Sequence, residues 1–120
     1  SPHLSVYRPI VTMVMSILHR ITGVANVVGI VLVAWWLVAA ASGPDYYAFA
    51  SGVLGSWFGM LVLFGFTWSV THHCLGGIRH LIWDTGHGFG ERPRQQLAWA
   101  TIVGSLSLTV LLWIIGIAAL

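Results

Sequence analysis

The sequence contains very little charge and no lysine. Of its 120 residues only 7% are charged whereas 58% are hydrophobic, and the net charge of +2 comes from arginines set against three acidic residues. Arginines this few exclude a nucleic-acid-binding surface, which would need a basic stripe. A soluble domain this short could not bury so much apolar surface, because small domains leave much of their surface in water. The composition therefore indicates a membrane protein.

Cysteine is equally scarce. Cys74 is the only cysteine, so the chain can form no internal disulfide and carries no cysteine set for an iron–sulfur cluster. Its neighbours His72 and His73 are not expected to complete a metal site with it, because consecutive helical residues point in different directions. A glycine-rich dinucleotide loop is also absent. These absences exclude flavin and cluster chemistry within this chain.

Three uncharged runs are long enough to cross a bilayer, which takes ~20 helical residues. We therefore expect an all-α membrane protein that forms part of a heteromeric helix bundle. The expected transmembrane helices cover residues 16–41, 47–79 and 95–119 of a single transmembrane domain spanning residues 1–120. Residues 1–14 are too short and too interrupted by proline for another span and are expected to form an interfacial arm.

The arginines predict the orientation of the chain. They cluster before the first span and around the link between the second and third spans, at Arg8, Arg20, Arg79, Arg92 and Arg94. The link between the first two spans carries only Asp45. The positive-inside bias places the N-terminus and the second link on the cytoplasmic or matrix side, and the C-terminus on the opposite side.

Glycines mark points of close approach. The Gly55-x-x-x-Gly59 pair is typical of helix packing, and Gly76 with Gly77 would admit a neighbouring helix or a flat ring.

The second span ends in "THHCLGGIRHLIWD", Thr71 to Asp84. If Arg79 lies near the membrane interface, His73 lies ~9 Å deeper, where an imidazole needs a polar partner. His80 shares the helix face of His73, whereas His72 points about 100° away.

Ser16 and Arg20 share a face of the first span and lie on the same membrane side as these histidines. The two groups can therefore meet. Taken singly, each has an ordinary alternative: Arg20 can reach lipid head groups, Arg79 and His80 can anchor the interface, and His73 can bond a neighbouring helix.

A b-type haem would use these features together, because imidazole binds iron, glycines admit the macrocycle and cationic groups pair with the propionates. His73 and His80, on one face of one helix, cannot both bind the same iron. The second ligand must come from the first span or another chain, and a partner subunit is expected. His19 is a candidate, although it is better placed beside the propionates.

Ser16 and Arg20 also suit a quinone. A hydroxyl can donate a hydrogen bond to a quinone carbonyl, and a guanidinium stabilises the negative charge that develops on reduction. A helix end near the interface is accessible to an isoprenoid quinone arriving through lipid.

Two motifs give the chain a family resemblance. "SPHLSVYRP" followed by "SILHRITG", and the pattern His-x-x-x-Gly-Ile-Arg-His-Leu-x-x-Asp over residues 73–84, resemble the cytochrome b membrane anchors of succinate dehydrogenase, respiratory complex II. With the three spans, the match covers essentially the whole chain. The resemblance implies that His73 is one axial ligand of haem b, shared with a histidine of a second membrane anchor subunit.

The same resemblance implies roles at the quinone and propionate positions. Ser16 and Arg20 would contribute to the ubiquinone site, completed by residues of the partner anchor and of the iron–sulfur subunit. His19, Arg20 and His80 would lie near the haem propionates. Asp84 would support the quinone site, with a helix cap or an ion pair to Arg79 as an equal alternative.

The family also implies the reaction and the location. A flavoprotein subunit oxidises succinate, an iron–sulfur subunit passes the electrons on, and the membrane pair delivers them to ubiquinone. The arm and the 84–94 loop would contact the soluble subunits. The expected location is the bacterial inner membrane, with the mitochondrial inner membrane as the alternative. Rival interpretations are the anchor of a quinol:fumarate reductase, a haem-free membrane scaffold and, last, a small channel.

Overall fold

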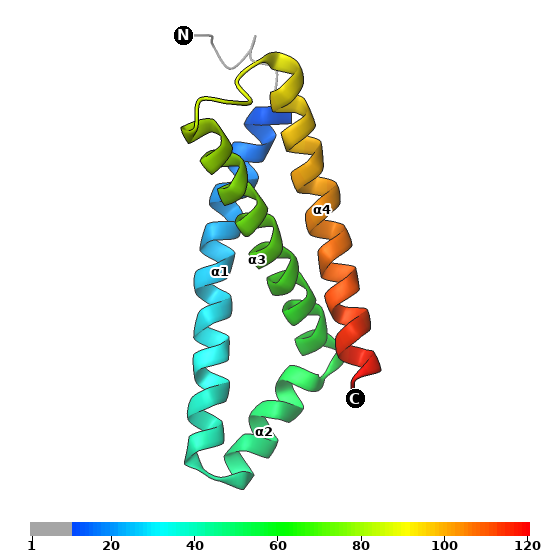
Figure 1. Cartoon of the computed structure of the whole chain (residues 1–120). Coiled ribbons are helices and arrows are strands. Elements are labelled where there is room, and N and C mark those ends of the chain that lie inside the picture. The colour runs from blue at the N-terminus through cyan, green and yellow to red at the C-terminus, as the bar shows by residue number, and fades with distance from the viewer. Residues whose placement is uncertain (1–10) are drawn as a thin grey trace, which may run out of the picture.

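The computed structural model describes the backbone of residues 11–120, and the side chains from Met13 onward. The described chain consists of four helices and no strand: α1 (Val11–Ser42), α2 (Pro44–Gly55), α3 (Trp57–Asp84) and α4 (Glu91–Ala118) (Figure 1). Three of them are long and apolar enough to cross a membrane, over Met13–Ser42, Trp57–Asp84 and Glu91–Ala118. The predicted all-α membrane fold with three spans is confirmed.

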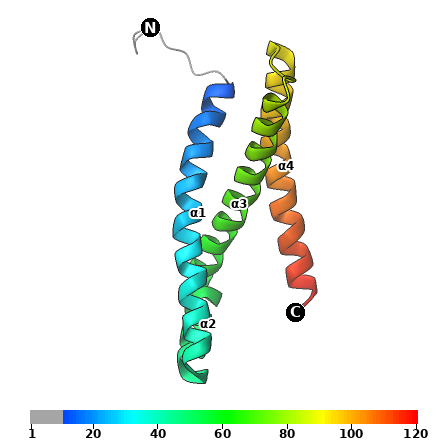
Figure 2. The same ribbon diagram turned by 60° about the vertical axis from the view of Figure 1, so that its left-hand side comes forward.

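Helix α3 holds the molecule together by contacting both α1 and α4. The start of α1, the end of α3 and the start of α4 lie at one end of the molecule, together with the 85–90 loop (Figures 1 and 2). Helix α2 lies at the opposite end (Figure 1). We call the end that carries the 85–90 loop the loop end.

The buried side chains are mostly small or polar, whereas the large apolar side chains face outward. Among the described residues the fully buried hydrophobic ones are Met15, Ala39, Ala50 and Ala98. Most other buried side chains are polar: Thr22, Ser69, His72, Arg79, Thr101, Ser105 and Thr109. Small and hydroxyl side chains let helices approach closely in a bilayer, where the apolar exterior meets lipid.

The expected single helix over residues 47–79 needs correction, because the chain breaks at Ser56. Residues 44–55 form the short helix α2, and only α3 is long enough to span. Ser56 is extended (φ −67°, ψ 161°) and caps α3, since its Oγ accepts a hydrogen bond from the Gly59 amide at 3.2 Å. The same hydroxyl donates to the Val53 carbonyl at 2.6 Å. The uncharged run therefore contains a short helix and a transmembrane helix.

Gly59 makes this break possible. A Cβ atom at this position would collide with the carbonyl oxygens of Val53 and Leu54, so the first turn of α3 approaches the last turn of α2 too closely for any side chain. A Cβ at Gly55 would meet nothing within 4 Å. Only one glycine of the pair therefore lies at a close approach, and the neighbour is the preceding helix.

The helix ends differ from the expected ones in three further places. Helix α3 continues to Asp84, beyond the expected end at residue 79. Residues 1–10 of the predicted arm lie outside the described residues, and Val11–Val14 belong to α1 instead. Helix α4 begins at Glu91, with Pro93 in its first turn, where a missing amide hydrogen is tolerated.

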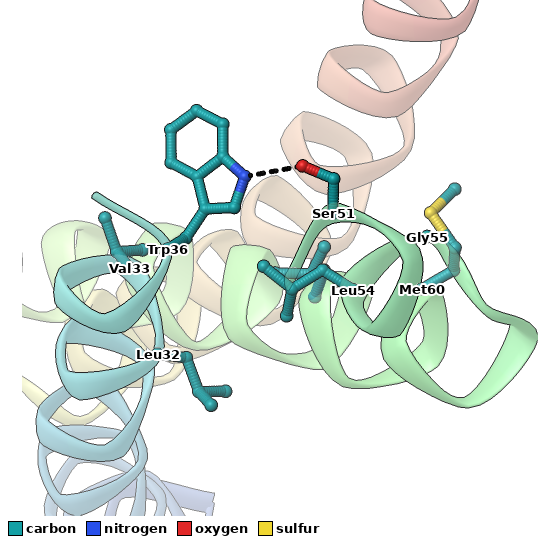
Figure 3. A pocket seen from close by; sticks show the side chains of 8 residues that line it. Leu32, Val33, Trp36, Ser51, Leu54, Gly55 and Met60 are labelled. Carbon is teal, nitrogen blue, oxygen red and sulfur yellow. Dashed lines mark hydrogen bonds between the residues drawn. The ribbon is translucent and has the colours of Figure 1, made fainter. Parts of the chain in front are cut away.

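A pocket of about 370 Å³ is lined by residues of α1, α2 and the first turns of α3 (Figure 3). Trp36 donates a hydrogen bond from Nε1 to Ser51 Oγ across it at 3.2 Å. The other lining residues are apolar side chains and one glycine, and no titratable group is among them. The chemistry of the chain is therefore to be sought at the loop end.

Candidate functional site

Three histidines meet between α1 and α3 at the loop end. The rings of His19 and His73 are stacked, with centroids 4.0 Å apart and planes inclined by 10°. His80 lies seven residues after His73 on the same face of α3. Its ring meets the His19 ring edge-on, with the centroids 5.1 Å apart. The structure thus brings together three of the residues that the sequence singles out.

Thr22 contacts one ring nitrogen of His73. Its side chain is buried, and its hydroxyl donates to the His19 carbonyl one turn earlier at 3.0 Å. The same oxygen lies 3.3 Å from His73 Nδ1. With its single hydrogen on the His19 carbonyl, the hydroxyl can accept a hydrogen bond from Nδ1–H. A neutral imidazole then has an unprotonated Nε2, which is the nitrogen available to a metal.

Further polar contacts fasten α1 to α3 at the same level. Ser69 Oγ lies 2.9 Å from the Thr22 carbonyl oxygen and 2.7 Å from Asn26 Oδ1. Sequence reasoning missed Thr22, Asn26 and Ser69 as site residues. A signal was present, because Thr22 and Asn26 follow His19 on one helix face and Ser69 precedes His73 by one turn.

Glycines shape the space around the rings. A Cβ at Gly76 would lie 2.6 Å from His19 Nδ1, so the imidazole of His19 depends on the absence of a side chain there. A Cβ at Gly23 would lie 3.4 Å from His73 Cε1. A Cβ at Gly77, one turn beyond His73 on the same face, would meet nothing within 4 Å. Space beside His73 therefore stays open along α3.

Ser16, Arg20 and Asp84 are exposed at the loop end and do not join the histidine cluster. Ser16 and Arg20 lie on the first turns of α1, and Asp84 is the last residue of α3. None of the three makes a hydrogen bond or ion pair to another described side chain. All three are therefore accessible from outside the chain.

A different face of α3 carries His72 and Arg79, which face α4. His72 is buried, and its Nδ1 lies 3.4 Å from Ser105 Oγ. The Arg79 guanidinium lies over the Trp83 ring, 5.2 Å from its centroid, and the considered ion pair between Arg79 and Asp84 is not formed. Helix α3 therefore separates two sets of polar residues.

The α1–α3 cluster fits a haem group. It offers one imidazole nitrogen, Nε2 of His73, that hydrogen bonding leaves free, with open space at Gly77. His19 Nδ1 is buried and has no hydrogen-bond partner among the described residues, which suits a carboxylate arriving with a bound group. The His19 ring stacks on the face of the His73 ring.

Fold and site together define a multi-pass helical membrane protein with a histidine cluster between two of its spans. Comparison with known proteins specifies the class. The family described as succinate dehydrogenase/fumarate reductase transmembrane subunit matches residues 1–114. The chain belongs to this family.

Named relatives agree with this assignment. The succinate dehydrogenase cytochrome b556 subunit of Paracoccus denitrificans is 45% identical over 115 residues, covering 96% of this chain and 88% of that protein. The subunit of the same name from Rickettsia prowazekii is 38% identical over 114 residues, with 95% and 89% covered. The mitochondrial succinate dehydrogenase cytochrome b560 subunit of Sus scrofa is 36% identical over 122 residues, with 100% and 69% covered.

Family membership and the three apolar helices identify a multi-pass inner-membrane protein that serves as a membrane anchor in a multi-subunit oxidoreductase. The predicted family, the all-α fold with three spans and the inner-membrane location are confirmed.

Proposed function

We propose that the chain is the cytochrome b anchor of a succinate:ubiquinone oxidoreductase, complex II, in which it binds haem b jointly with a second anchor and helps to form the ubiquinone-reduction site. The observation that carries the proposal is the hydrogen bond of 3.3 Å between His73 Nδ1 and the Thr22 hydroxyl, which leaves Nε2 of His73 free. The relatives' names favour succinate oxidation over fumarate reduction.

His73 is the proposed axial ligand. Haem b, when bound, supplies a one-electron redox centre. Thr22 holds the imidazole in its ligating tautomer, and a hydrogen bond to the remote nitrogen of a metal-bound histidine also raises its basicity. His80 lies on the same face of α3 as His73 and cannot reach the far side of one iron, so the second ligand is assigned to the partner anchor.

His19, Arg20 and His80 are proposed to receive the haem propionates. His19 contributes a buried Nδ1 without a partner among the described residues, and its ring contacts both other histidines of the cluster. Arg20 and His80 are exposed at the same end, where a carboxylate can form charge-assisted hydrogen bonds.

Ser16 and Arg20 are proposed to bind ubiquinone. They are one turn apart on α1, exposed and close to the end of the span, so a quinone in the lipid can reach them. Ser16 donates a hydrogen bond to a quinone carbonyl, and Arg20 supplies the positive charge that stabilises its reduction. Asp84, exposed at the end of α3, is proposed to support the site by holding a proton. Other chains complete the site.

The proposed partners follow from the same reaction. A flavoprotein subunit oxidises succinate, an iron–sulfur subunit carries the electrons, and the second anchor shares haem and quinone with this chain. The loop end, with Arg20, Arg92 and Arg94, is proposed to face the cytoplasm or matrix and the soluble subunits.

A reduced-minus-oxidised optical spectrum of the purified complex tests the proposal. We expect a low-spin b-type signal in the native complex and its loss or shift in His73→Ala. His72→Ala is the matched control, because it removes a neighbouring buried imidazole that faces α4, and it should keep the native spectrum. An unchanged spectrum in His73→Ala would remove the ligand assignment. A native complex without a haem signal would reduce the chain to a scaffold.

A further inference from the structure

A buried guanidinium lies between α3 and α4, apart from the histidine cluster. Arg79 is only 3% exposed. It lines a pocket of about 110 Å³ whose other walls are Leu75, Ile78, Ile82, Leu97, Ala100 and Thr101. Arg79 and His73 differ by about 120° around the helix axis, so this pocket and the proposed haem site open on different faces of α3.

No described residue of the chain satisfies the charge of Arg79. Its Nε and Nη1 atoms are buried and have no hydrogen-bond partner among the described residues. The Trp83 ring 5.2 Å away offers a cation–π contact but no acceptor for these N–H groups. Removing an unpaired cation and its donors from water costs several kcal/mol, so an external acceptor is needed.

The chemistry of the pocket identifies that acceptor as an oxyanion. A guanidinium presents a planar fork of donors that matches phosphate and carboxylate oxygens. Thr101, the one hydroxyl in the lining, gives its hydrogen to the Leu97 carbonyl at 2.8 Å and does not compete as a donor.

We propose that this pocket binds the phosphate of an anionic phospholipid. Arg79 lies five residues before the end of α3, roughly 7.5 Å along the helix axis, which is the depth of a head group at a membrane interface. The surrounding leucine and isoleucine side chains suit the acyl chains that accompany such a head group.

Burial within one chain favours a lipid over a carboxylate of a partner protein. Helices α3 and α4 already enclose Arg79 without any partner, and the pocket is too small for a helix. A small mobile head group can enter it from the lipid, whereas a partner would have to insert a single side chain.

The test compares lipid retention by the detergent-washed, intact complex with that of its variants, by native mass spectrometry and by phosphorus analysis of organic extracts. We expect the native complex to retain one anionic phospholipid at this pocket. Arg79→Gln should retain it at least about tenfold more weakly, as expected for the loss of charge-assisted hydrogen bonds. Arg92→Gln, an exposed arginine at the start of α4, is the matched control and should retain it normally.

A second variant covers the case in which Arg79→Gln does not assemble. Ala100→Trp keeps the guanidinium but places bulk at the exposed side of the pocket, and it should also lose the lipid. Equal phospholipid retention in the native complex and in either variant would overturn the proposal.

Adding probes to delipidated native complex distinguishes the sources of phosphate. Phosphatidylglycerol in mixed micelles should raise the thermal unfolding midpoint of the native complex but not that of Arg79→Gln. The same rise with inorganic phosphate alone would overturn the lipid assignment in favour of free phosphate. Loss of the soluble subunits from Arg79→Gln with lipid retention unchanged would overturn it in favour of a partner carboxylate.

Discussion

At the scale of single residues, the Thr22 hydroxyl contacts Nδ1 of His73, the proposed haem ligand. Thr22 is buried between α1 and α3, and with its hydrogen on the His19 carbonyl its oxygen is placed to accept from His73 Nδ1. Water does not compete for hydrogen bonds inside a bilayer, and a low dielectric strengthens those that form. This contact favours the tautomer of His73 that carries its hydrogen on Nδ1.

Thr22→Val removes this hydrogen bond while keeping the side-chain shape. Loss of the support of a metal-bound histidine commonly lowers affinity by ~10–100-fold, so we expect a lower haem-to-protein ratio and a shifted haem midpoint potential. Both are measured on the purified complex by pyridine haemochrome assay and redox titration. Thr22→Ser should restore them, and Thr109→Val, the same change at a buried site on α4, should leave them native. Native potential and occupancy in Thr22→Val would contradict the assignment.

The exposed residues of α1 give a second prediction at this scale. Ser16→Ala removes one neutral hydrogen bond of ~0.5–1.5 kcal/mol, so the KM for ubiquinone should rise about 2- to 12-fold. Arg20→Leu should lower kcat/KM by more, because a charge-assisted contact is lost. Ser107→Ala, an exposed serine on α4, serves as the control. Dye reduction by the soluble subunits should be unchanged throughout, and unaltered quinone kinetics in both variants would make these residues structural.

At the scale of elements, α3 is a helix with two working faces. His73 and His80 face α1, whereas His72 and Arg79 face α4. Adjacent residues of a helix differ by about 100° in direction, so neighbours in the sequence enter different environments. The break at Ser56 sets the residue at which α3 begins. It therefore also sets how deep in the membrane the side chains of each face lie.

The break depends on Gly59, which provides a prediction for the element. Gly59→Ala places a Cβ against the carbonyl oxygens of Val53 and Leu54, and such overpacking typically costs about 1–3 kcal/mol. We expect a lower thermal unfolding midpoint for the complex. Gly55→Ala is the matched control, because its Cβ meets open space, and it should unfold at the native midpoint or above. Equal destabilisation by both variants would show that the break is not held by close approach.

At the scale of the whole molecule, the chain presents an apolar exterior to neighbours or lipid. Large aliphatic side chains on α1 and α4 are more than half exposed, including Val24 at 68% and Ile114 at 59%. The buried interior consists mainly of small and hydroxyl side chains. In a bilayer, burying apolar surface between helices brings no hydrophobic gain, because lipid tails are equally apolar. Polar contacts and close packing therefore hold the helices together.

The arginine distribution predicts how this molecule sits in the membrane. In a Cys74→Ala background, His87→Cys in the 85–90 loop should react with an impermeant maleimide only in inside-out vesicles, because positively charged loops stay on the cytoplasmic side. Ser42→Cys, at the connection between α1 and α2, should react only from the outside of intact cells with a permeable outer envelope. The reverse labelling pattern would invert the proposed orientation.

Much of this protein follows from the sequence by itself. Hydropathy is a property of local composition, so the three spans and the membrane environment can be read from the chain without knowing how it folds. The two motifs around Ser16–Gly23 and His73–Asp84 identify the family, and the family model confirms it. The same motifs predict His73 as a haem ligand and Ser16 and Arg20 as quinone-binding residues.

Other features depend on which surfaces meet. The break at Ser56 leaves no trace in hydropathy, because the residues on both sides of it are equally apolar. The partnership of Thr22 with His73 joins positions 51 residues apart, and the separation of Arg79 from the cluster depends on α4 covering that face of α3. Sequence alone determined the number of spans, the family and the candidate ligand, since these depend on local patterns. Only the tertiary structure decided the contact of Thr22 with His73 and the burial of Arg79 without a hydrogen-bond partner for its Nε and Nη1 atoms among the described residues, since both depend on how helices dock.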